Sequence, residues 1–187
     1  MKMKLEEIKK VLGQEFRYDA SFITEVIKTL DLKKDANILD IGTGRGVMAI
    51  LLALNGYHVI TGEPEGDNWA DWRRSAQKVG AENLIHFQYL KAEKLPFNNG
   101  EFDAIFMYTS FHHIDDKAKA LKECVRVIKR GGRIIIIELT PEGVEEVRKS
   151  FPSHPDAVDP RTYLEHLPLY VEVIENGNVN AYIFKKK

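Results

Sequence analysis

The sequence has 187 residues, of which 44% are hydrophobic and 29% are charged. That length and balance predict one folded domain, residues 1–187, and exclude a disordered chain. The formal net charge of −1 provides no overall attraction to nucleic acid or to an anionic membrane surface.

The single cysteine, Cys124, excludes an internal disulfide framework and a multi-cysteine zinc site. It lies in an apolar pattern with Leu121, Val125 and Ile128, so we expect a buried core thiol. The N-terminus is charged and lacks the apolar run of a signal peptide. Because no apolar stretch approaches the ~20 residues that span a bilayer, we expect a cytoplasmic protein without a membrane partner.

The N-terminal part of the chain predicts two amphipathic helices. Apolar residues recur at helical spacing over 3–12 and over 22–30. Asp19 precedes the second stripe and is a residue type that favours a helix N-cap. Since both helices precede the first strand, we interpret residues 1–35 as a candidate cap over an α/β core of residues 36–187.

Beyond residue 36, strands and helices alternate. The apolar runs and their glycine breakers predict a strand over 37–42, a helix over 45–55, a strand over 57–62, a helix over 67–79, strands over 84–90 and 102–108, a helix over 116–129 and a strand over 133–139. Apolar strands that alternate with helices predict a parallel sheet with helices on both faces.

The C-terminal part has a different pattern. Residues 142–150 predict a short helix and 151–160 a loop. Two strand-like runs, 169–174 and 179–184, then flank a segment that contains Asn-Gly, which is a strong hairpin signal. We therefore predict an α/β fold of five parallel strands finished by a C-terminal antiparallel hairpin.

One glycine-rich turn is the most informative stretch for function. Gly42, Gly44 and Gly46 follow a buried strand and precede an unbroken apolar run over 47–54. Such a turn lets a ligand approach the backbone near a helix N-terminus. The dinucleotide fingerprint is G-x-G-x-x-G, and its third glycine would stand where Val47 stands here. The turn predicts a nucleotide cofactor and disfavours NAD.

Two carboxylates lie near this turn in the sequence. Asp40 stands two residues before Gly42 at the end of the strand, where a carboxylate is costly unless it meets a partner. Glu63 follows Gly42 by about 20 residues, just past the second strand, where it can reach a ribose diol. The alternative interpretation of Glu63 is a solvated turn residue.

At these residues the sequence resembles the class I S-adenosylmethionine-dependent methyltransferases. Residues 40–46 look like the first motif of that family, and the resemblance continues in order through Glu63 and through 92–97, 101–106, 111–114 and 121–133. It covers about residues 36–139. The resemblance implies a Rossmann-like seven-stranded sheet whose last strand runs antiparallel to the others.

The resemblance also implies S-adenosylmethionine as the cofactor and S-adenosylhomocysteine as its product. The implied cofactor-binding residues, from the methionine moiety to the adenine and back to the sulfonium, are Asp40, Gly42, Thr43, Gly44, Gly46, Glu63, Pro64, Ala92, Glu93 and Met107. One departure is Lys91, which stands where family members often carry aspartate and cannot accept a hydrogen bond from the adenine amino group. Glu93 or a backbone carbonyl must then do so.

The residues that follow the strand over 102–108 bear on the methyl acceptor. Phe111, His112 and His113 resemble the small-molecule branch of the family, including quinone-type methyltransferases, and the signature of amino-group methylation on nucleobases is absent. Tyr108 lies near the sulfonium in this resemblance and offers a ring face to its charge. We name Tyr108, His112 and His113 as candidate catalytic residues, with packed structural histidines as the alternative.

A metal interpretation of this loop is weaker. His112, His113, Asp115 and Asp116 are close in sequence, but neighbouring side chains on a loop rarely converge on one ion. The two aspartates suit the N-cap of the next helix. We therefore predict no metal site.

The acceptor pocket cannot come from an inserted domain, because only residues 140–167 separate the last parallel strand from the hairpin. We expect its wall to come from the N-terminal helices and the loop that contains His154, with Tyr18, His154 and Asp156 as candidates and a plain surface loop as the alternative. Trp69 and Trp72 either shield the adenine or pack a helix.

The leading hypothesis is methyl transfer from S-adenosylmethionine to a small-molecule acceptor by in-line displacement. The alternatives are a cofactor-binding, non-catalytic subunit or sensor with the same fold, and an aminopropyl transferase, which would need an acidic channel. The glycine spacing and the hairpin disfavour an NAD-dependent dehydrogenase, and the lack of a basic stripe disfavours a nucleic acid partner. Homo-oligomerisation and the identity of the acceptor stay open.

Overall fold

The computed structural model describes residues 4–12, 19–67, 70–164 and 167–186. Tyr18 and Trp69, for which we predicted site roles, lie outside the described residues. The described strands are β1 (Ile38–Ile41), β2 (Val59–Glu63), β3 (Ile85–Tyr89), β4 (Phe102–Tyr108), β5 (Ile128–Leu139), β6 (Leu169–Asn176) and β7 (Val179–Lys186).

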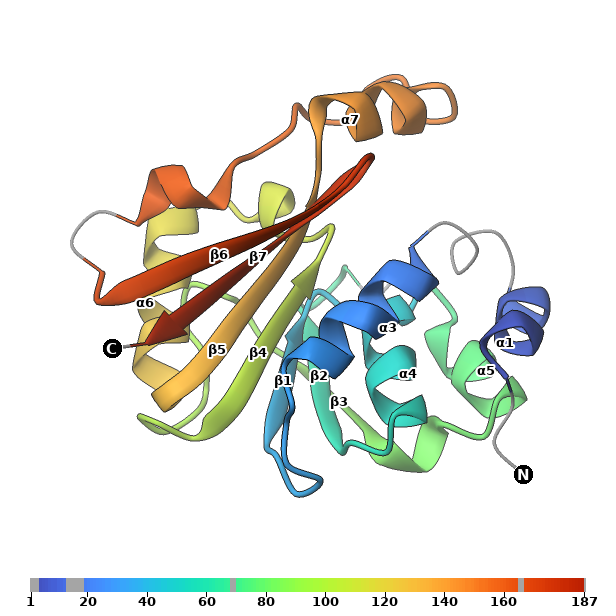
Figure 1. Ribbon diagram of the computed structural model, residues 1–187, viewed down its shortest axis with the longest axis horizontal. Coiled ribbons are helices and arrows are strands. Elements are labelled where there is room, and N and C mark those ends of the chain that lie inside the picture. Colours follow the sequence, from blue (N-terminus) through green and yellow to red (C-terminus); the bar gives the residue numbers. More distant parts are fainter. Residues whose placement is uncertain (1–3, 13–18, 68–69, 165–166, 187) are drawn as a thin grey trace.

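These strands form one sheet in the order β3-β2-β1-β4-β5-β7-β6. The strands β1 to β5 are parallel, and β7 runs antiparallel to both β5 and β6 (Figure 1). The chain reverses between β6 and β7 at Gly177 and Asn178, where Gly177 has a φ of 58°. The predicted fold, five parallel strands and an antiparallel C-terminal hairpin, is confirmed.

Helices cover both faces of the sheet (Figure 1). They are α1 (Leu5–Leu12), α3 (Ala20–Thr29), α4 (Val47–Leu54), α5 (Trp72–Lys78), α6 (Lys117–Val127) and α7 (Pro141–Arg148), with the 3-10 turns η1 (Glu82–Leu84), η2 (Phe111–His113) and η3 (Pro160–Tyr163). Within β5, Ile135 and Ile137 pack in the core cluster of α1, α3, α4 and α5, whereas Ile134 and Ile136 pack in the cluster of α6. Successive strand side chains point to opposite faces, so a strand covered on both faces is apolar at every position.

Helix α4 fixes the position of the glycine turn. Seven of its eight residues are buried, because it lies between the sheet and α3 and has no solvent face. It begins at Val47 rather than at residue 45, since Gly46 occupies the N-cap position with a φ of 78°. The N-terminal helices share the same core: Ile8 and Leu12 of α1 and Ile27 of α3 are buried in its cluster.

The start of β5 was predicted wrongly. The strand begins at Ile128 and includes Gly131 and Gly132, where we expected a break before residue 133. Its pairing with β4 shifts register between Phe102 and Ala104, so the extra residues are taken up by an irregularity in the ladder. The pairs on either side are Phe102 with Ile128 and Ala104 with Arg133, so the glycines lie in the irregular part of the ladder and the strand resumes after them.

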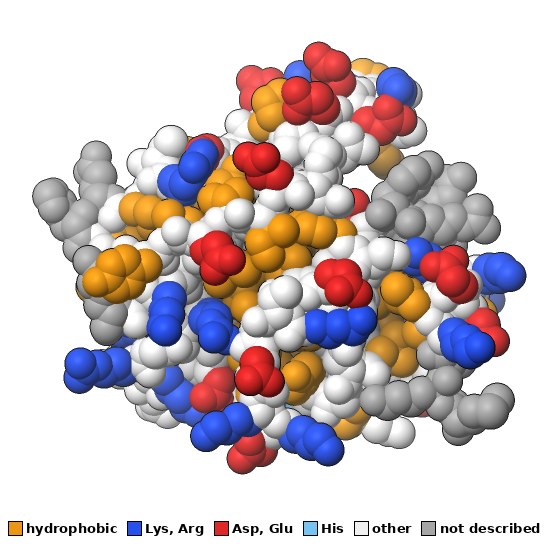
Figure 2. Space-filling view, viewed as in Figure 1, with side chains coloured by type: hydrophobic (Ala, Val, Ile, Leu, Met, Phe, Trp, Pro, Cys, Tyr) orange, Lys and Arg blue, Asp and Glu red, His pale blue; other side chains and the backbone are white. Residues whose placement is uncertain are grey.

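Three further features complete the description of the fold. No helix within the described ranges combines the length and the apolar composition needed to cross a membrane. On the face shown in Figure 2, acidic and basic side chains surround a central group of apolar ones. The buried thiol of Cys124 is confirmed as part of the core, and burial raises its pKa.

Candidate cofactor and acceptor site

Two glycines of the turn after β1, Gly42 and Gly44, have different surroundings. Gly42 has a φ of 93°, and a Cβ there would lie 2.4 Å from the Cβ of Ser110, so a side chain does not fit. Gly44 has a φ of 48°, but a Cβ there would meet no atom within 4 Å. Gly42 is therefore required by packing inside the protein, whereas Gly44 borders open space.

Asp40 is fully buried at the end of β1. Its Oδ2 accepts a hydrogen bond from the Thr61 hydroxyl at 2.8 Å, and that hydroxyl lies 2.8 Å from the Thr43 hydroxyl. Since Thr61 gives its only proton to Asp40, Thr43 donates to Thr61. Burial raises the pKa of Asp40 to about 7, the Thr61 bond opposes the shift, and the charge of Glu63 adds to it. Asp40 Oδ1 has no partner among the described residues.

Glu63 ends the neighbouring strand β2 and points to the same turn. One of its oxygens, Oε1, accepts a hydrogen bond from the backbone N–H of Gly44. The other, Oε2, is buried and has no partner within the described part of the chain. Burial raises the pKa of this carboxyl, against the effect of the Gly44 bond. The turn is therefore flanked by two buried carboxylates that each leave one oxygen for a hydrogen-bond donor.

The predicted adenine segment lies next to Glu63. The backbone N–H of Leu90 donates to the Glu63 carbonyl at 2.9 Å, and a bridge between Lys91 and Lys94 then closes a tight turn. Within that turn Ala92 is buried and Glu93 is half-buried. Pro64, directly after β2, is half-buried, and the side chain of Lys91 is exposed.

Trp72 packs a helix and does not cover the turn from outside. Its side chain is 3% exposed in the core cluster of α4, and its Cβ is the atom that a Cβ on Gly46 would meet, at 2.9 Å. The guanidinium of Arg73 lies 4.5 Å from the centre of the indole ring. Of the two alternatives for this residue, the structure favours helix packing.

The end of β4 connects the N-terminal helices to the site. Met107 is fully buried, and the hydroxyl of Tyr108 donates to Asp19 Oδ2 at 2.6 Å. Asp19 stands at the N-cap position of α3, but its side chain makes no capping hydrogen bond, although its residue type predicted one. Burial raises the pKa of the Asp19 carboxyl. The next residue, Thr109, has a φ of 46°, which is rare for a β-branched side chain. Ser110 Oγ donates to the Ile41 carbonyl at 2.7 Å and ties this loop to the glycine turn.

Glu138, near the end of β5, organises η2. Its Oε1 accepts from the backbone N–H groups of Phe111 at 2.8 Å and His112 at 3.2 Å, and its Oε2 lies 2.7 Å from His112 Nδ1. Glu138 was not among the predicted site residues. The signal was present, because an acidic residue that follows four isoleucines in a buried strand needs a specific partner.

The histidines of η2 meet a residue from a distant loop. His112 is buried, His113 is exposed, and their ring centres are 4.1 Å apart. The ring of His154, from the loop after α7, lies 4.8 Å from that of His112. Burial lowers the pKa of His113, and the neighbouring His112 and His154 add to the shift.

The remaining predicted residues lie around this group. Asp156 is exposed, and its Oδ1 accepts from the Arg148 guanidinium at 2.7 Å. Asp116 caps α6 by accepting from the Lys119 N–H at 2.9 Å, as its residue type predicted. Asp115 is exposed.

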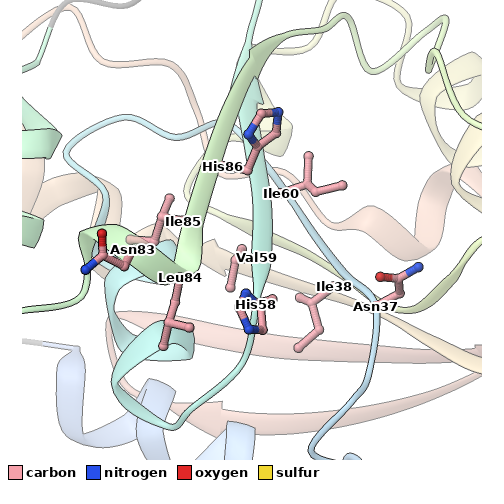
Figure 3. A pocket seen from close by; sticks show the side chains of 9 residues that line it. All are labelled: Asn37, Ile38, His58, Val59, Ile60, Asn83, Leu84, Ile85 and His86. Atoms are coloured by element: carbon pink, nitrogen blue, oxygen red, sulfur yellow. The ribbon is translucent and has the colours of Figure 1, made fainter.

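A hollow of about 210 Å³ lies at the amino ends of the parallel strands, where β1, β2 and β3 begin (Figure 3). It is lined by residues 37–38, 58–60 and 83–86. Ligands of open α/β sheets bind outside the carboxyl ends of the strands, which are the ends that carry the glycine turn. The turn is therefore the candidate functional site.

A parallel sheet with buried carboxylates and a glycine turn at its carboxyl edge defines a nucleotide-cofactor-binding α/β protein. Residues 39–136, just over half of the chain, match the family described as methyltransferase domain. The chain belongs to this family.

Individual relatives agree with this assignment. A demethylmenaquinone methyltransferase of Clavibacter sepedonicus is 32% identical over 66% of this chain and 49% of its own. The crystal structure of the YcgJ protein of Bacillus subtilis is 27% identical, with a TM-score of 0.68, over 83% of this chain and 71% of its own. A SAM dependent methyltransferase from Aquifex aeolicus, 23% identical, shares the fold with a TM-score of 0.69 over 98% of both chains. The chain spans about half the length of the curated relatives it matches.

The residues present fit S-adenosylmethionine. This cofactor carries an ammonium group and a ribose diol, which both donate hydrogen bonds. The unpartnered buried oxygens, Asp40 Oδ1 and Glu63 Oε2, are acceptors at the ends of adjacent strands. The open space at Gly44 lies between them in the chain.

Proposed function

We propose that this protein transfers a methyl group from S-adenosylmethionine to a small-molecule acceptor by in-line displacement at the sulfonium. The observation that carries the proposal is the pair of buried, half-satisfied carboxylates, Asp40 and Glu63, beside the open face of Gly44. A buried polar atom without a partner is costly, and a bound ligand that donates to it removes that cost.

The cofactor would then lie along the ends of three strands. Asp40 takes the amino group of the methionine moiety, and Glu63 exchanges its Gly44 bond for the ribose hydroxyls. Ala92 and Glu93 line the adenine, which stacks on Pro64. The position of the adenine segment beside Glu63, fixed by the bond from Leu90, supports this order.

The acceptor side is proposed at the end of β4. Transfer from an activated sulfonium needs alignment and exclusion of water more than it needs a base. The bond between Tyr108 and Asp19 places the start of α3 next to this edge, which supports a capping role for the N-terminal helices. We propose that Tyr108 lies against the reacting groups and that His113, which is exposed, is better placed than buried His112 to act as a base.

A quinone-type acceptor is supported by the demethylmenaquinone methyltransferase relative, which covers about two thirds of this chain. The other expectations continue as predictions: a cytoplasmic location, no nucleic acid partner, and an oligomeric state that a sizing measurement would decide.

The test is calorimetric titration with S-adenosylmethionine, S-adenosylhomocysteine and NAD. We expect binding of both adenosyl compounds and none of NAD. The Glu63→Ala variant loses two hydrogen bonds to a charged group and should weaken S-adenosylhomocysteine binding by at least tenfold, since such bonds contribute about 1.5–3 kcal/mol each. The matched control is Glu65→Ala, an exposed glutamate two residues away. Unchanged affinity in Glu63→Ala would refute the ribose assignment.

Cofactor binding alone does not separate an enzyme from a non-catalytic cofactor-binding subunit. The second measurement is therefore release of S-adenosylhomocysteine in the presence of hydroquinone-type and other small hydroxylated acceptors. Turnover with any of them supports the enzyme. Binding without turnover across such a panel favours the subunit or sensor.

A further inference from the structure

We propose that His112, His113 and His154 bind a divalent transition-metal ion, most favourably zinc, at the carboxyl edge of the sheet. One ring nitrogen from each of the three histidines lies within 4.8 Å of the others. Their ring centres are 4.1, 4.8 and 6.0 Å apart. Imidazole is the ligand that zinc and its neighbours in the transition series share most often in such sites.

The separations are close to what a metal needs. Zinc–nitrogen bonds of about 2.0–2.1 Å put tetrahedral ligand atoms roughly 3.4 Å apart. The three nitrogens must therefore approach one another by at most about 1.4 Å on binding. His113 is exposed and His154 is half-buried, so their rings have room to turn, while buried His112 supplies the fixed ligand.

The hydrogen bonds of His112 and His154 use Nδ1 and leave Nε2 of each ring available to a metal. A carboxylate and a carbonyl can only accept, so the Nδ1 atoms of His112 and His154 donate, to Glu138 at 2.7 Å and to the Pro155 carbonyl at 2.9 Å. Each neutral ring then carries its lone pair on Nε2, the form that binds a metal. The Nε2 of His112 is buried and has no partner within the described residues.

Both of these ligands are also supported from behind. Glu138 accepts from His112 Nδ1 and from the backbone N–H groups of Phe111 and His112, which is the carboxylate–histidine arrangement that orients metal ligands. Arg148 donates twice to the carbonyl of His154, at 2.7 and 2.9 Å, and holds the loop against α7. A packed structural histidine explains the Glu138 bond, but it leaves the buried His112 Nε2 unsatisfied.

No metal site was predicted, because His112, His113, Asp115 and Asp116 are neighbours in one loop. His154 is 41 residues beyond His113 and lies in the loop that follows α7 in the sequence. The third ligand could therefore not be inferred from spacing. Asp116 caps α6, and the group of possible ligands among the described residues consists of the three histidines.

Three protein ligands leave a coordination position open, as in catalytic rather than structural zinc sites. His112 and His113 follow Tyr108 in the chain, and Ser110, just before them, donates a hydrogen bond to the Ile41 carbonyl at the start of the glycine turn. If the methyltransferase function proposed above holds, an ion here would bind an oxygen, nitrogen or sulfur atom of the acceptor and lower its pKa. His113 would then act as a ligand of the ion, in place of the base role proposed for it without a metal. The role of the ion rests on the proposed function; the metal site itself does not.

The experiment is a titration of untagged, chelator-treated protein with Co²⁺, read from the visible absorption of the bound ion, followed by displacement with Zn²⁺. We expect one equivalent to bind with micromolar or tighter affinity. His154→Ala should raise the dissociation constant at least tenfold, and Glu138→Gln by about 10–100-fold. The matched control is His86→Ala, which removes an exposed histidine on β3 and should leave cobalt binding unchanged.

The proposal is overturned if the wild type binds no cobalt at these concentrations, or if His154→Ala and His86→Ala bind it equally. Circular dichroism of each variant checks that η2 and the sheet stay folded, and His154→Ala changes only a loop residue. Titration with S-adenosylhomocysteine in the same samples reports on the cofactor site separately, so failure of the metal site and failure of the proposed function give different results.

Discussion

The contrast between Gly42 and Gly44 gives the sharpest test of the turn geometry. Both residues have positive φ, so alanine at either position pays about 1–2 kcal/mol of backbone strain. Only at Gly42 does the new Cβ also collide, at 2.4 Å from the Cβ of Ser110, which adds about 1–3 kcal/mol of overpacking. We therefore expect Gly42→Ala to lose about 2–5 kcal/mol of unfolding free energy, and Gly44→Ala only about 1–2 kcal/mol.

The assay is thermal and urea unfolding of both variants without cofactor, together with S-adenosylhomocysteine titration. In a domain of this size each 1 kcal/mol lowers the melting temperature by about 2–4 °C, so Gly42→Ala should melt roughly 4–20 °C below the wild type. Gly44→Ala should melt a few degrees lower but bind S-adenosylhomocysteine at least tenfold more weakly, because its methyl group enters the cofactor space.

A double variant isolates the collision. Adding Ser110→Gly to Gly42→Ala removes the atoms that the new Cβ meets, and the two changes should couple by about 1–2 kcal/mol in a double-mutant cycle. If Gly42→Ala is as stable as Gly44→Ala, or if Gly44→Ala binds cofactor normally, the division between a packing glycine and a ligand-facing glycine is incorrect.

Three other predictions concern the groups around the turn. Asp40 has a pKa of about 7 in the folded protein and about 3.9 when unfolded, so the native state binds the proton more tightly and loses stability as pH rises from about 4 to 7. The unfolding free energy of Asp40→Asn should therefore rise relative to that of the wild type across that window. Urea unfolding that gives the same difference between variant and wild type at pH 5 and pH 7 would contradict this. Tyr108→Phe leaves the partly buried Asp19 carboxylate without its donor and should cost about 1–3 kcal/mol in the same assay, against almost no change for exposed Tyr89→Phe. Native Cys124 should not react with a disulfide reagent until the protein unfolds, because it is buried and burial raises its pKa; fast reaction of the folded protein would show that the α6 face opens.

Much of the fold followed from local patterns. The alternation of apolar strands with helices predicted the parallel sheet, because strands covered on both faces must be apolar throughout. Strand β4 was predicted with its observed bounds, since its apolar run is closed by polar residues on both sides. The start of β5 was not, because Gly131 and Gly132 look like a break when the partner strand is unknown.

The candidate site divides in the same way. The glycine turn and Glu63 could be found because their chemistry depends on spacing along one strand–turn–helix unit. The role of Asp19 could not, because its partner Tyr108 is 89 residues away and a helix N-cap was the better local explanation. The acidic residue Glu138 is unusual in an apolar strand and could have been noticed in the sequence, but nothing in the sequence indicates that its partner is His112.

The sequence by itself determined which segments form strands, that both faces of the sheet are covered and that a hairpin follows the parallel strands, and it predicts a nucleotide cofactor at the glycine turn. These depend on residue type and periodicity over a few residues. The tertiary structure alone decided that Asp19 meets Tyr108, that Glu138 holds His112, and that His154 joins the two histidines of η2. The reason is physical: parallel strands bring their carboxyl ends to one edge regardless of the chain length between them, so the residues that meet there are set by strand order and loop packing.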